Sequence, residues 1–278
     1  MPIVAEQNKS DFGYSRADFN VVRAKLKQLA GINLADSKDS MVYSRLSRRI
    51  RALQLSDFPS YLRHLDTNAN EQEEFINALT TNLTSFFRES HHFDHLREWV
   101  SKNNRPLKIW CAAASTGQEP YSIAMKVVEG FGRFDIPVEI IASDIDSKVL
   151  ATASAGVYKL EQLDDMDLAL KKRFFYRGKG AQSGSVRVKS ELRNLLSFQK
   201  VNLMDERYAL PNDFDIVFCR NVMIYFDKST QLAILNKITR HMKPQGLYYA
   251  GHSENFSNTP DLLTSLGKTI YQYRGGST

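Results

Sequence analysis

Residues 107–144 read LKIWCAAASTGQEPYSIAMKVVEGFGRFDIPVEIIASD and carry the clearest structural signal in the chain. The stretch opens with a short apolar run at 107–112, continues with a helix-like segment at 119–131, and closes with a second apolar run at 138–144. Two buried strands joined by a helix are the unit from which parallel sheets are built. The pattern therefore predicts an α/β fold.

The same alternation continues through residue 274. Further strands are predicted at 196–203, 215–220, 246–252 and 268–274, and further helices at 148–154 and 229–242. We expect a doubly wound, mostly parallel sheet with helices on both faces. Between the last two strands, the polar stretch NFSNTPD predicts a helix plus a turn, which leaves the last strand free to run antiparallel.

Residues 16–100 show helical periodicity instead. A first helix is predicted to end at Gly31, and its apolar positions recur at helical spacing: Phe19, Val22, Leu26 and Leu29. Three more helices are predicted at 39–53, 58–65 and 71–79. We therefore expect a small all-helical domain at 12–88, a linker at 89–105, and the α/β domain at 106–278.

A basic, glycine-rich segment interrupts the α/β pattern. The loop RGKGAQSGS (177–185) lies between β-like FFYR (174–177) and VRVK (186–189), which predicts a small antiparallel β insert at about 171–195. Residues 171–193 hold eight basic residues and one acidic residue, a local charge of +7, whereas the whole chain carries +6. This surplus favours one local acidic partner over nucleic acid bound along the molecule.

The composition is that of a globular protein. The 278 residues are 42% hydrophobic and 24% charged, which excludes global disorder and a disulfide-stapled miniprotein. No apolar run reaches the roughly 18–20 residues of a membrane helix, and the N-terminal residues lack the pattern of a signal peptide. We expect a cytoplasmic protein with no direct membrane insertion. Cys111 and Cys219 are predicted to be buried thiols, with spatial proximity left open.

Polar side chains follow several predicted strands, at the edge where open α/β sheets bind ligands. A small-residue turn with Gly117 follows the first strand, although the G-x-G-x-x-G pattern is absent. Glu119 lies just beyond this turn, and Asp144, after the second strand, is placed to bind ribose hydroxyls. The later strand ends carry Asn202, Leu203, Cys219, Arg220 and Asn221, with Tyr225 close behind. Each residue alone fits a solvated loop, but together they predict a nucleoside-binding edge.

Five segments together resemble the CheR-type chemotaxis methyltransferases: TNLTSFFRE (81–89), AAASTGQEPYSIA (112–124), ASDID (142–146), FCRNVMIYFD (218–227) and AGHSENFSN (250–258). The resemblance implies a seven-stranded methyltransferase sheet, S-adenosylmethionine as cofactor, S-adenosylhomocysteine as product, and no metal. It also implies methyl transfer to glutamate side chains of bacterial chemoreceptors, for chemotactic adaptation.

The resemblance further implies roles for single residues. The positions expected to line the cofactor pocket are Asn82, Thr84, Arg88, Glu119, Asp144, Asn202, Leu203, Cys219 and Arg220. Those expected nearest to methyl transfer are Arg88, Arg220 and Tyr225. A glutamate nucleophile is already ionised at neutral pH, so no general base is needed. Which carboxylate each arginine holds stays open.

Two basic surfaces are candidate receptor contacts. Arg45, Arg48 and Arg49 share a helix face that is either simply solvated or, as the resemblance implies, docks the receptor's methylation helices. The insert is either structural or, as in part of the family, the place where the receptor's C-terminal pentapeptide adds a strand. Its expected tether residues are Arg177, Gly178, Lys179, Gly180 and Arg187.

Other functions fit the sequence less well. A nucleic-acid methyltransferase is disfavoured despite a pI near 9.2, because the Asn/Asp-Pro-Pro-Tyr/Phe turn and a Pro-Cys nucleophile are both absent. A non-catalytic adaptor stays open. His91 and His95 have metal-like spacing but no third ligand, so a helix start with solvated imidazoles is expected. His252 is expected to be structural, with a place near the pocket as the alternative.

Overall fold

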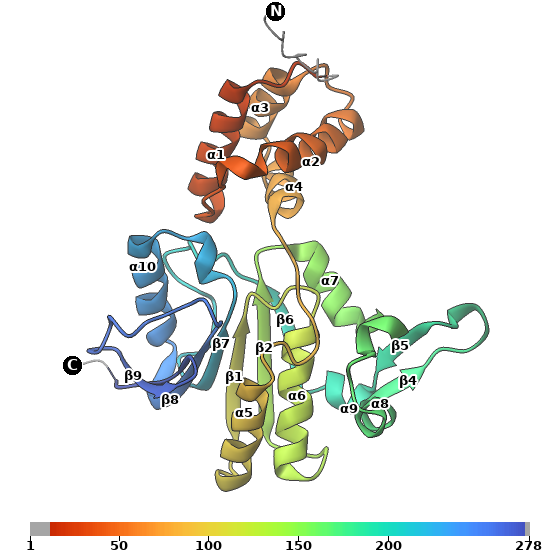
Figure 1. The fold of residues 1–278 in the computed structure, drawn as a ribbon, viewed down its shortest axis with the longest axis vertical. Coiled ribbons are helices and arrows are strands. Elements are labelled where there is room, and N and C mark those ends of the chain that lie inside the picture. The colour runs from red at the N-terminus through yellow and green to blue at the C-terminus, as the bar shows by residue number, and fades with distance from the viewer. Residues whose placement is uncertain (1–11, 276–278) are drawn as a thin grey trace, which may run out of the picture. The chain divides into compact units, whose positions relative to one another are not determined.

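The computed structural model describes residues 12–275 and divides into unit 1, Met1–Thr81, and unit 2, Asn82–Thr278 (Figure 1). The sequence placed the end of the helical domain later, at residue 88. Residues 82–88 nevertheless bond within unit 2: Ser115 Oγ donates to the Asn82 carbonyl at 3.1 Å and Phe87 N donates to Ser122 Oγ at 3.0 Å. Residues 1–11, most of the stretch considered for a signal peptide, lie outside the described residues. Within residues 12–275, no helix has the length and apolarity needed to cross a membrane.

Unit 1 is helical, as predicted. Its elements are α1 (Arg16–Ala30), the 3-10 turn η1 (Asp36–Lys38), α2 (Asp39–Ala52), α3 (Phe58–Thr67) and α4 (Ala69–Leu79). Ser15 and Asp18 form a capping box at the start of α1, and Gly31 ends the helix with a left-handed φ of 72°. The apolar faces of these helices form the core of the unit, with fully buried Phe19, Leu26, Leu46, Phe58 and Phe75.

Unit 2 is built on a seven-stranded sheet in the order β6-β2-β1-β7-β8-β10-β9. The strands are β1 (Leu107–Ala112), β2 (Val138–Asp144), β6 (Leu196–Lys200), β7 (Phe214–Cys219), β8 (Met242–Ala250), β9 (Leu263–Gly267) and β10 (Ile270–Tyr273). Neighbouring strands from β6 to β8 are parallel, and β10 is antiparallel to both β8 and β9. This confirms the predicted doubly wound, mostly parallel sheet with an antiparallel last strand.

Helices and short turns connect these strands. They are α5 (His91–Lys102), α6 (Gln118–Phe131), α7 (Ser147–Ala155), η2 (Leu160–Leu163), α8 (Leu168–Phe174), η3 (Gly180–Gln182), α9 (Ser190–Arg193), η4 (Met223–Tyr225) and α10 (Lys228–Thr239). Figure 1 shows α5 and α6 side by side on one face of the sheet, where they contact one another. The order strand–helix–strand brings the carboxyl ends of β1, β2, β6 and β7 to one edge of the sheet.

Two local expectations differ from the structure. Residues 89–105, predicted as a linker, contain α5, because Phe93, Leu96 and Val100 recur at helical spacing and are buried in the core of unit 2. The helix predicted between the last two strands is wrong. That region holds turns followed by β9, whose backbone pairs with β10.

The predicted insert is present as a second sheet with the order β3-β5-β4. Its antiparallel strands are β3 (Val157–Lys159), β4 (Phe175–Arg177) and β5 (Ser185–Val188). Three residues are too few for an alternating pattern to show, which is why β3 was not predicted from the sequence. One face of this sheet packs into the core of unit 2 through Tyr158, Phe175, Val186 and Val188.

Candidate functional site

The turn between β1 and α6 forms the centre of the carboxyl edge of the sheet. Ser115 N donates to Asp144 Oδ2 at 2.8 Å, which ties this turn to the end of β2. Ala113 and Ser115 have positive φ angles of 61° and 49°, and Gly117 has 98°. Left-handed residues that alternate with other conformations turn the backbone amides of a tight loop toward one side, as in anion- and nucleotide-binding turns.

Asp144 and Asn82 lie on either side of this turn. The second Asp144 oxygen, Oδ1, accepts from Asp146 N at 3.0 Å, and burial raises the pKa of Asp144. Asn82 Nδ2 donates to Asp146 Oδ2 at 3.1 Å. Backbone amides of Ser115, Ile145 and Asp146 thus act on the Asp144 carboxylate, whose two oxygens offer about four acceptor sites and so can take a further donor such as a ribose hydroxyl. Asn82 and Asp144 are thus linked through Ser115 and Asp146, each of which bonds to both of them.

Arg220 is the centre of a buried ion cluster. Its Nη1 donates to Glu119 Oε2 at 2.7 Å, and its Nη2 donates to Glu89 Oε2 at 2.9 Å and to the Arg88 carbonyl at 2.6 Å. The guanidinium also lies 5.4 Å from the centre of the Phe93 ring. The side chain has no exposed surface, and Nε has no hydrogen-bond partner among the described residues. The fork of Arg220 is thus already engaged by the protein.

Glu89 and Glu119 differ in their protonation behaviour. Burial raises the pKa of Glu119, although Arg220 opposes this, and Cys111 Sγ donates to Glu119 Oε1 at 3.4 Å. Burial would also raise the pKa of Glu89, but hydrogen bonds from Arg220 and Asn221 lower it to about 2. One guanidinium therefore faces two carboxylates, and this corner of the site favours an additional cation.

Glu89 should make folding sensitive to acid. A carboxyl whose pKa falls on folding stabilises the folded protein at pH values above the pKa of the unfolded state, which is 4.5 for Glu89. This stabilisation is lost as the pH falls toward the folded pKa of about 2. Over that range, we expect the wild type to lose about 3 kcal/mol more free energy of unfolding than the Glu89→Gln variant. Acid titration followed by tryptophan fluorescence measures both losses, and equal losses would contradict the assignment.

Arg88 and Tyr225 are less enclosed than Arg220. Arg88 is partly exposed, and its Nη1 donates to the Leu83 carbonyl at 3.1 Å. Tyr225 ends η4 and is partly exposed. The backbone of Arg88 therefore joins the Arg220 cluster, whereas its side chain and that of Tyr225 keep access to solvent.

The remaining predicted cofactor residues are more dispersed. Asn202 follows β6 and accepts from Met204 N at 2.9 Å, and Leu203 beside it is buried. Thr84 is partly exposed in the segment before α5. Cys219 is fully buried in β7, which pairs with β1, so it and Cys111 lie on neighbouring strands as free thiols.

Sequence reasoning missed the role of Glu254. This buried carboxylate accepts three backbone amides: Asn221 N at 3.0 Å, Gly251 N at 2.6 Å and Met223 N at 2.8 Å. It therefore joins the loop after β7, which carries Arg220 and Tyr225, to the loop after β8. The segment AGHSENFSN contained this residue, but a carboxylate that binds distant backbone amides leaves no periodic signal.

The histidines near α5 correct one expectation. His92 is fully buried rather than solvated, its Nε2 lies 2.9 Å from the Lys268 carbonyl, and burial lowers its pKa to about 3. His91 stacks on His252 with ring centroids 5.2 Å apart. Among the described residues, no group of three or more His, Cys, Asp or Glu side chains is arranged to hold a metal ion.

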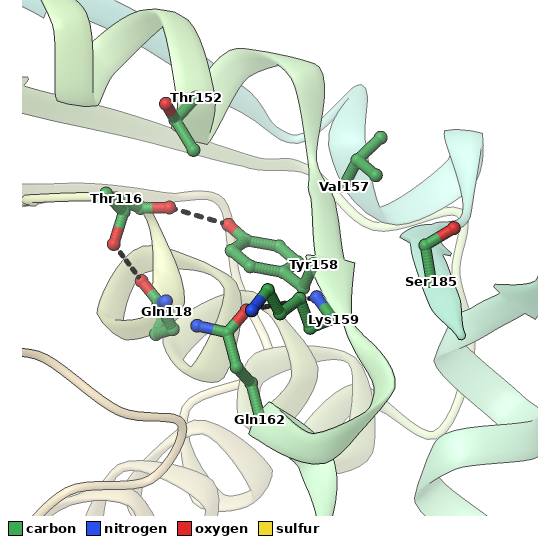
Figure 2. Close-up of a pocket in the computed structure, with 8 residues that line it drawn as sticks. All are labelled: Thr116, Gln118, Thr152, Val157, Tyr158, Lys159, Gln162 and Ser185. Carbon is green, nitrogen blue, oxygen red and sulfur yellow. Dashed lines mark hydrogen bonds between the residues drawn. The ribbon is translucent and has the colours of Figure 1, made fainter. Parts of the chain in front are cut away.

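A cavity of about 260 Å³ lies beside the β1–α6 turn, toward the insert. Figure 2 shows Tyr158 and Gln118 reaching the turn, where the Tyr158 hydroxyl donates to the Thr116 carbonyl at 2.8 Å. The lining residues are Thr116, Gln118, Thr152, Val157, Tyr158, Lys159, Gln162 and Ser185. None of the predicted cofactor residues lines it, so this cavity is separate from the strand ends that they occupy.

In unit 1, two of the three predicted docking arginines are bound within the helical bundle. Arg45 Nη1 donates to the carbonyls of Ala78 and Thr80 at 3.0 and 2.7 Å. Arg49 donates through Nε and Nη2 to the buried Glu71 at 3.0 and 2.6 Å. Arg48, in contrast, is exposed. Of the three arginines predicted to dock the receptor, Arg48 is therefore the one whose side chain is exposed to a partner.

The predicted tether residues lie in the insert. Arg177 ends β4, Arg187 lies on β5, and both are exposed. Gly178 has no room for a side chain, since a Cβ there would lie 2.0 Å from the Gln182 carbonyl oxygen. Gly180 has a left-handed φ of 56° and, like Lys179, is exposed. The glycines thus shape the loop, while the basic side chains extend from it.

Comparison with known proteins gives two adjoining family matches. Residues 17–80 match the model described as "CheR methyltransferase, all-alpha domain", and residues 82–272 match "CheR methyltransferase, SAM binding domain". The first match lies in unit 1 and the second in unit 2. The five segments singled out in the sequence lie between residues 81 and 258, so apart from Thr81 they fall within the second match.

Curated relatives agree with these matches. Chemotaxis protein methyltransferase 2 of Pseudomonas aeruginosa is 53% identical over 264 residues, which cover 94% of each chain. The chemotaxis protein methyltransferase of Salmonella typhimurium is 49% identical over 259 residues, covering 92% of this chain and 90% of that protein. The Escherichia coli protein of the same name is 47% identical over 92% of this chain and 91% of its own.

Proposed function

Because the chain belongs to the CheR methyltransferase family, we propose that it transfers the methyl group of S-adenosylmethionine to glutamate carboxylates of bacterial chemoreceptors. The family resemblance predicted from the sequence is confirmed, and the chain is a methyltransferase with an S-adenosylmethionine-binding domain. The observation that carries the proposal is the match to chemotaxis methyltransferases along nearly the whole chain, at up to 53% identity. The products would be glutamyl methyl esters and S-adenosylhomocysteine, formed in the cytoplasm for chemotactic adaptation.

The carboxyl edge of the sheet fits such a cofactor. The buried Nε of Arg220 lacks an acceptor among the described residues, and the two carboxylates around Arg220 exceed its single charge. A ligand that carries both a carboxylate and positive charge satisfies both conditions, and S-adenosylmethionine is such a ligand. Asp144 would accept the ribose hydroxyls, and Asn202 and Leu203 would contact the adenine. When bound, the sulfonium supplies an activated methyl group.

The work of the protein is then to position an ionised carboxylate. A glutamate is deprotonated at neutral pH, so the site needs no general base, and an aligned near-attack geometry can lower the barrier by about 7–11 kcal/mol. Since the fork of Arg220 is occupied by Glu89, Glu119 and a carbonyl, Arg88 is the arginine left to bind an incoming carboxylate. Tyr225 offers a hydroxyl donor to the same group.

Arg88→Ala should therefore affect catalysis more than folding. The Arg88 side chain donates a hydrogen bond to the Leu83 carbonyl and is partly exposed, so its removal costs little stability. We expect methyl transfer to fall by more than about tenfold, since one charge-assisted contact to the reacting carboxylate is lost. Incorporation of labelled methyl groups into receptor measures the loss, with the exposed Arg133→Ala as control. Wild-type turnover in Arg88→Ala would remove this role.

The proposed activity itself is tested by calorimetry with S-adenosylmethionine and S-adenosylhomocysteine, followed by methyl labelling of receptor-containing membranes. We expect binding of both nucleosides and base-labile methyl esters on the receptor. Binding without labelling of any receptor fraction would favour a non-catalytic adaptor and would contradict the proposal.

Receptor docking through unit 1 is the second part of the proposal. Because Arg45 and Arg49 hold the helical bundle together, Arg48 is the position at which charge reversal tests docking without breaking internal bonds. We expect Arg48→Glu to raise KM for the receptor more than it lowers kcat, since acidic helices would bind less well. Arg133→Glu is the matched charge reversal in unit 2, and an unchanged KM in Arg48→Glu would contradict docking there.

The third part concerns the insert, which would bind the C-terminal pentapeptide of a receptor. Strands β3 and β4 are the two edges of the small sheet, and an extended peptide can pair with a free edge. Arg177 and Arg187 lie at β4 and on the adjoining β5, and their charge suits an acidic peptide with a terminal carboxylate. Titration with receptor C-terminal peptides tests this, with Arg187→Glu and a C-terminally amidated peptide as controls. No binding by any receptor peptide would exclude the tether.

A further inference from the structure

Glu89 lies where the segment before α5 meets the loop after β7. Its side chain is 9% exposed, and its carboxylate accepts from Arg220 Nη2 at 2.9 Å and from Asn221 Nδ2 at 3.1 Å. Both Glu89 and Asn221 have a left-handed backbone, with φ of 58° at each residue. Left-handed non-glycine residues are strained, and they persist where the surrounding contacts hold them in place.

The same contact reaches Arg88. Arg220 Nη2 bonds at once to the Glu89 carboxylate and to the Arg88 carbonyl, at 2.9 and 2.6 Å. The backbone from which the Arg88 side chain extends is therefore fixed by the orientation of the Arg220 guanidinium. Without a carboxylate at position 89, Nη2 would keep only the carbonyl, and Asn221 would lose its side-chain acceptor.

On the basis of the function proposed above, we propose that Glu89 is a positioning residue for methyl transfer, one that fixes Arg220, Asn221 and the backbone of Arg88 together. Its contacts are to protein groups, and it acts through the two arginines rather than on substrate. Glu119 does not replace it, because that carboxylate binds the other terminal nitrogen, Nη1, at 2.7 Å. Glu89 thereby connects two segments that are more than a hundred residues apart in the sequence.

The test uses the full chain with the Glu89→Gln substitution. Glutamine keeps the shape of the side chain but removes its charge, and its NH2 group replaces an oxygen that accepts a hydrogen bond from Arg220 or Asn221. At a temperature where the variant is folded, we expect kcat to fall about tenfold or more while KM for the receptor changes less than about threefold. Glu98→Gln is the control, since Glu98 is exposed on α5 and pairs with Lys102 at 2.6 Å. It should leave both constants unchanged.

A double-mutant cycle separates positioning from a general structural role. If Glu89 acts through Arg220, the Glu89→Gln and Arg220→Lys substitutions together should reduce kcat no more than the stronger of the two does alone. Independent, multiplicative losses, or wild-type kcat in folded Glu89→Gln, would overturn the proposal. If Glu89→Gln fails to fold, Glu89→Asp is the second variant, because it keeps the charge but shortens the side chain by one methylene. Its kcat should still fall, and a wild-type kcat in Glu89→Asp would overturn the positioning role.

A wild-type chain that transfers no methyl group would instead refute the proposed function.

Discussion

Arg220→Met should unfold far more easily than the wild type, with a loss of about 3–5 kcal/mol in the free energy of unfolding. The substitution leaves Glu89 and Glu119 buried near one another with no cation between them. Removing one partner of a buried ion pair costs more than the pair contributes, because the remaining charge keeps its full desolvation penalty. Methionine fills much of the volume but supplies no donor, so packing does not offset the loss.

Denaturation by urea, followed by tryptophan fluorescence, measures this effect in the relevant unit, since both tryptophans of the chain, Trp99 and Trp110, lie in unit 2. The exposed Arg97→Met is the control and should change stability by less than about 0.5 kcal/mol. A loss below about 1 kcal/mol in Arg220→Met would show that the cluster is not a buried ion network.

The loss in Arg220→Met should also depend on pH. Burial raises the pKa of Glu119 in the folded protein, so this carboxyl destabilises the fold least at a pH below the pKa of the unfolded state. Without the charge of Arg220, Glu119 becomes protonated more easily still. The stability deficit should therefore be smaller at pH 5 than at pH 8.

Gly117→Ala should destabilise unit 2 by about 2–4 kcal/mol and weaken nucleoside binding. A Cβ at this position would lie 2.6 Å from the Tyr158 hydroxyl and 2.8 Å from the Ala153 Cβ. Tyr158 cannot move away cheaply, because its hydroxyl bonds to the Thr116 carbonyl in the same turn. The left-handed φ of 98° adds a backbone cost of about 1 kcal/mol or more. The turn that holds Ser115 N against Asp144 would shift with it.

Gly132→Ala is the matched control for this glycine. Gly132 also has a left-handed backbone, with φ of 74°, but a Cβ there would meet nothing within 4 Å. The control should show only the backbone cost of about 1–2 kcal/mol and unchanged affinity for S-adenosylhomocysteine. Equal losses in the two variants would mean that close packing at Gly117 is unimportant. Urea denaturation and calorimetry provide the two measurements.

The outcome for α5 shows why some elements could not be read from the chain. Its apolar residues Phe93, Leu96 and Val100 have helical spacing, but the run SHHFDH (90–95), which includes Phe93, suggested a helix start with solvated histidines. In the structure, His92 is buried against the carbonyl of Lys268, which lies in the turn between β9 and β10. A histidine is polar in the sequence and becomes a core residue only when a distant carbonyl accepts its hydrogen bond.

The arginines show the same limit more strongly. Arg45, Arg48 and Arg49 were indistinguishable as members of one basic helix face, yet Arg49 binds the buried Glu71 and Arg45 binds two carbonyls at the end of α4. Likewise, Arg88 and Arg220 were interchangeable as candidate carboxylate ligands. The bonds from Arg220 to Glu89 and Glu119 now separate them.

The sequence by itself determined the parallel strands of the main sheet, most of the longer helices, the two-part organisation, and the strand ends that carry Asp144, Asn202 and Arg220, but not α5, β3 or β9. These follow from local periodicity and from the rule that parallel strands present their carboxyl ends at one edge, so neighbouring residues suffice. Only the tertiary structure decided which charges are neutralised internally and which remain free. That choice depends on partners far apart in the chain and on how deeply each is buried, because burial sets the cost of an unpaired charge.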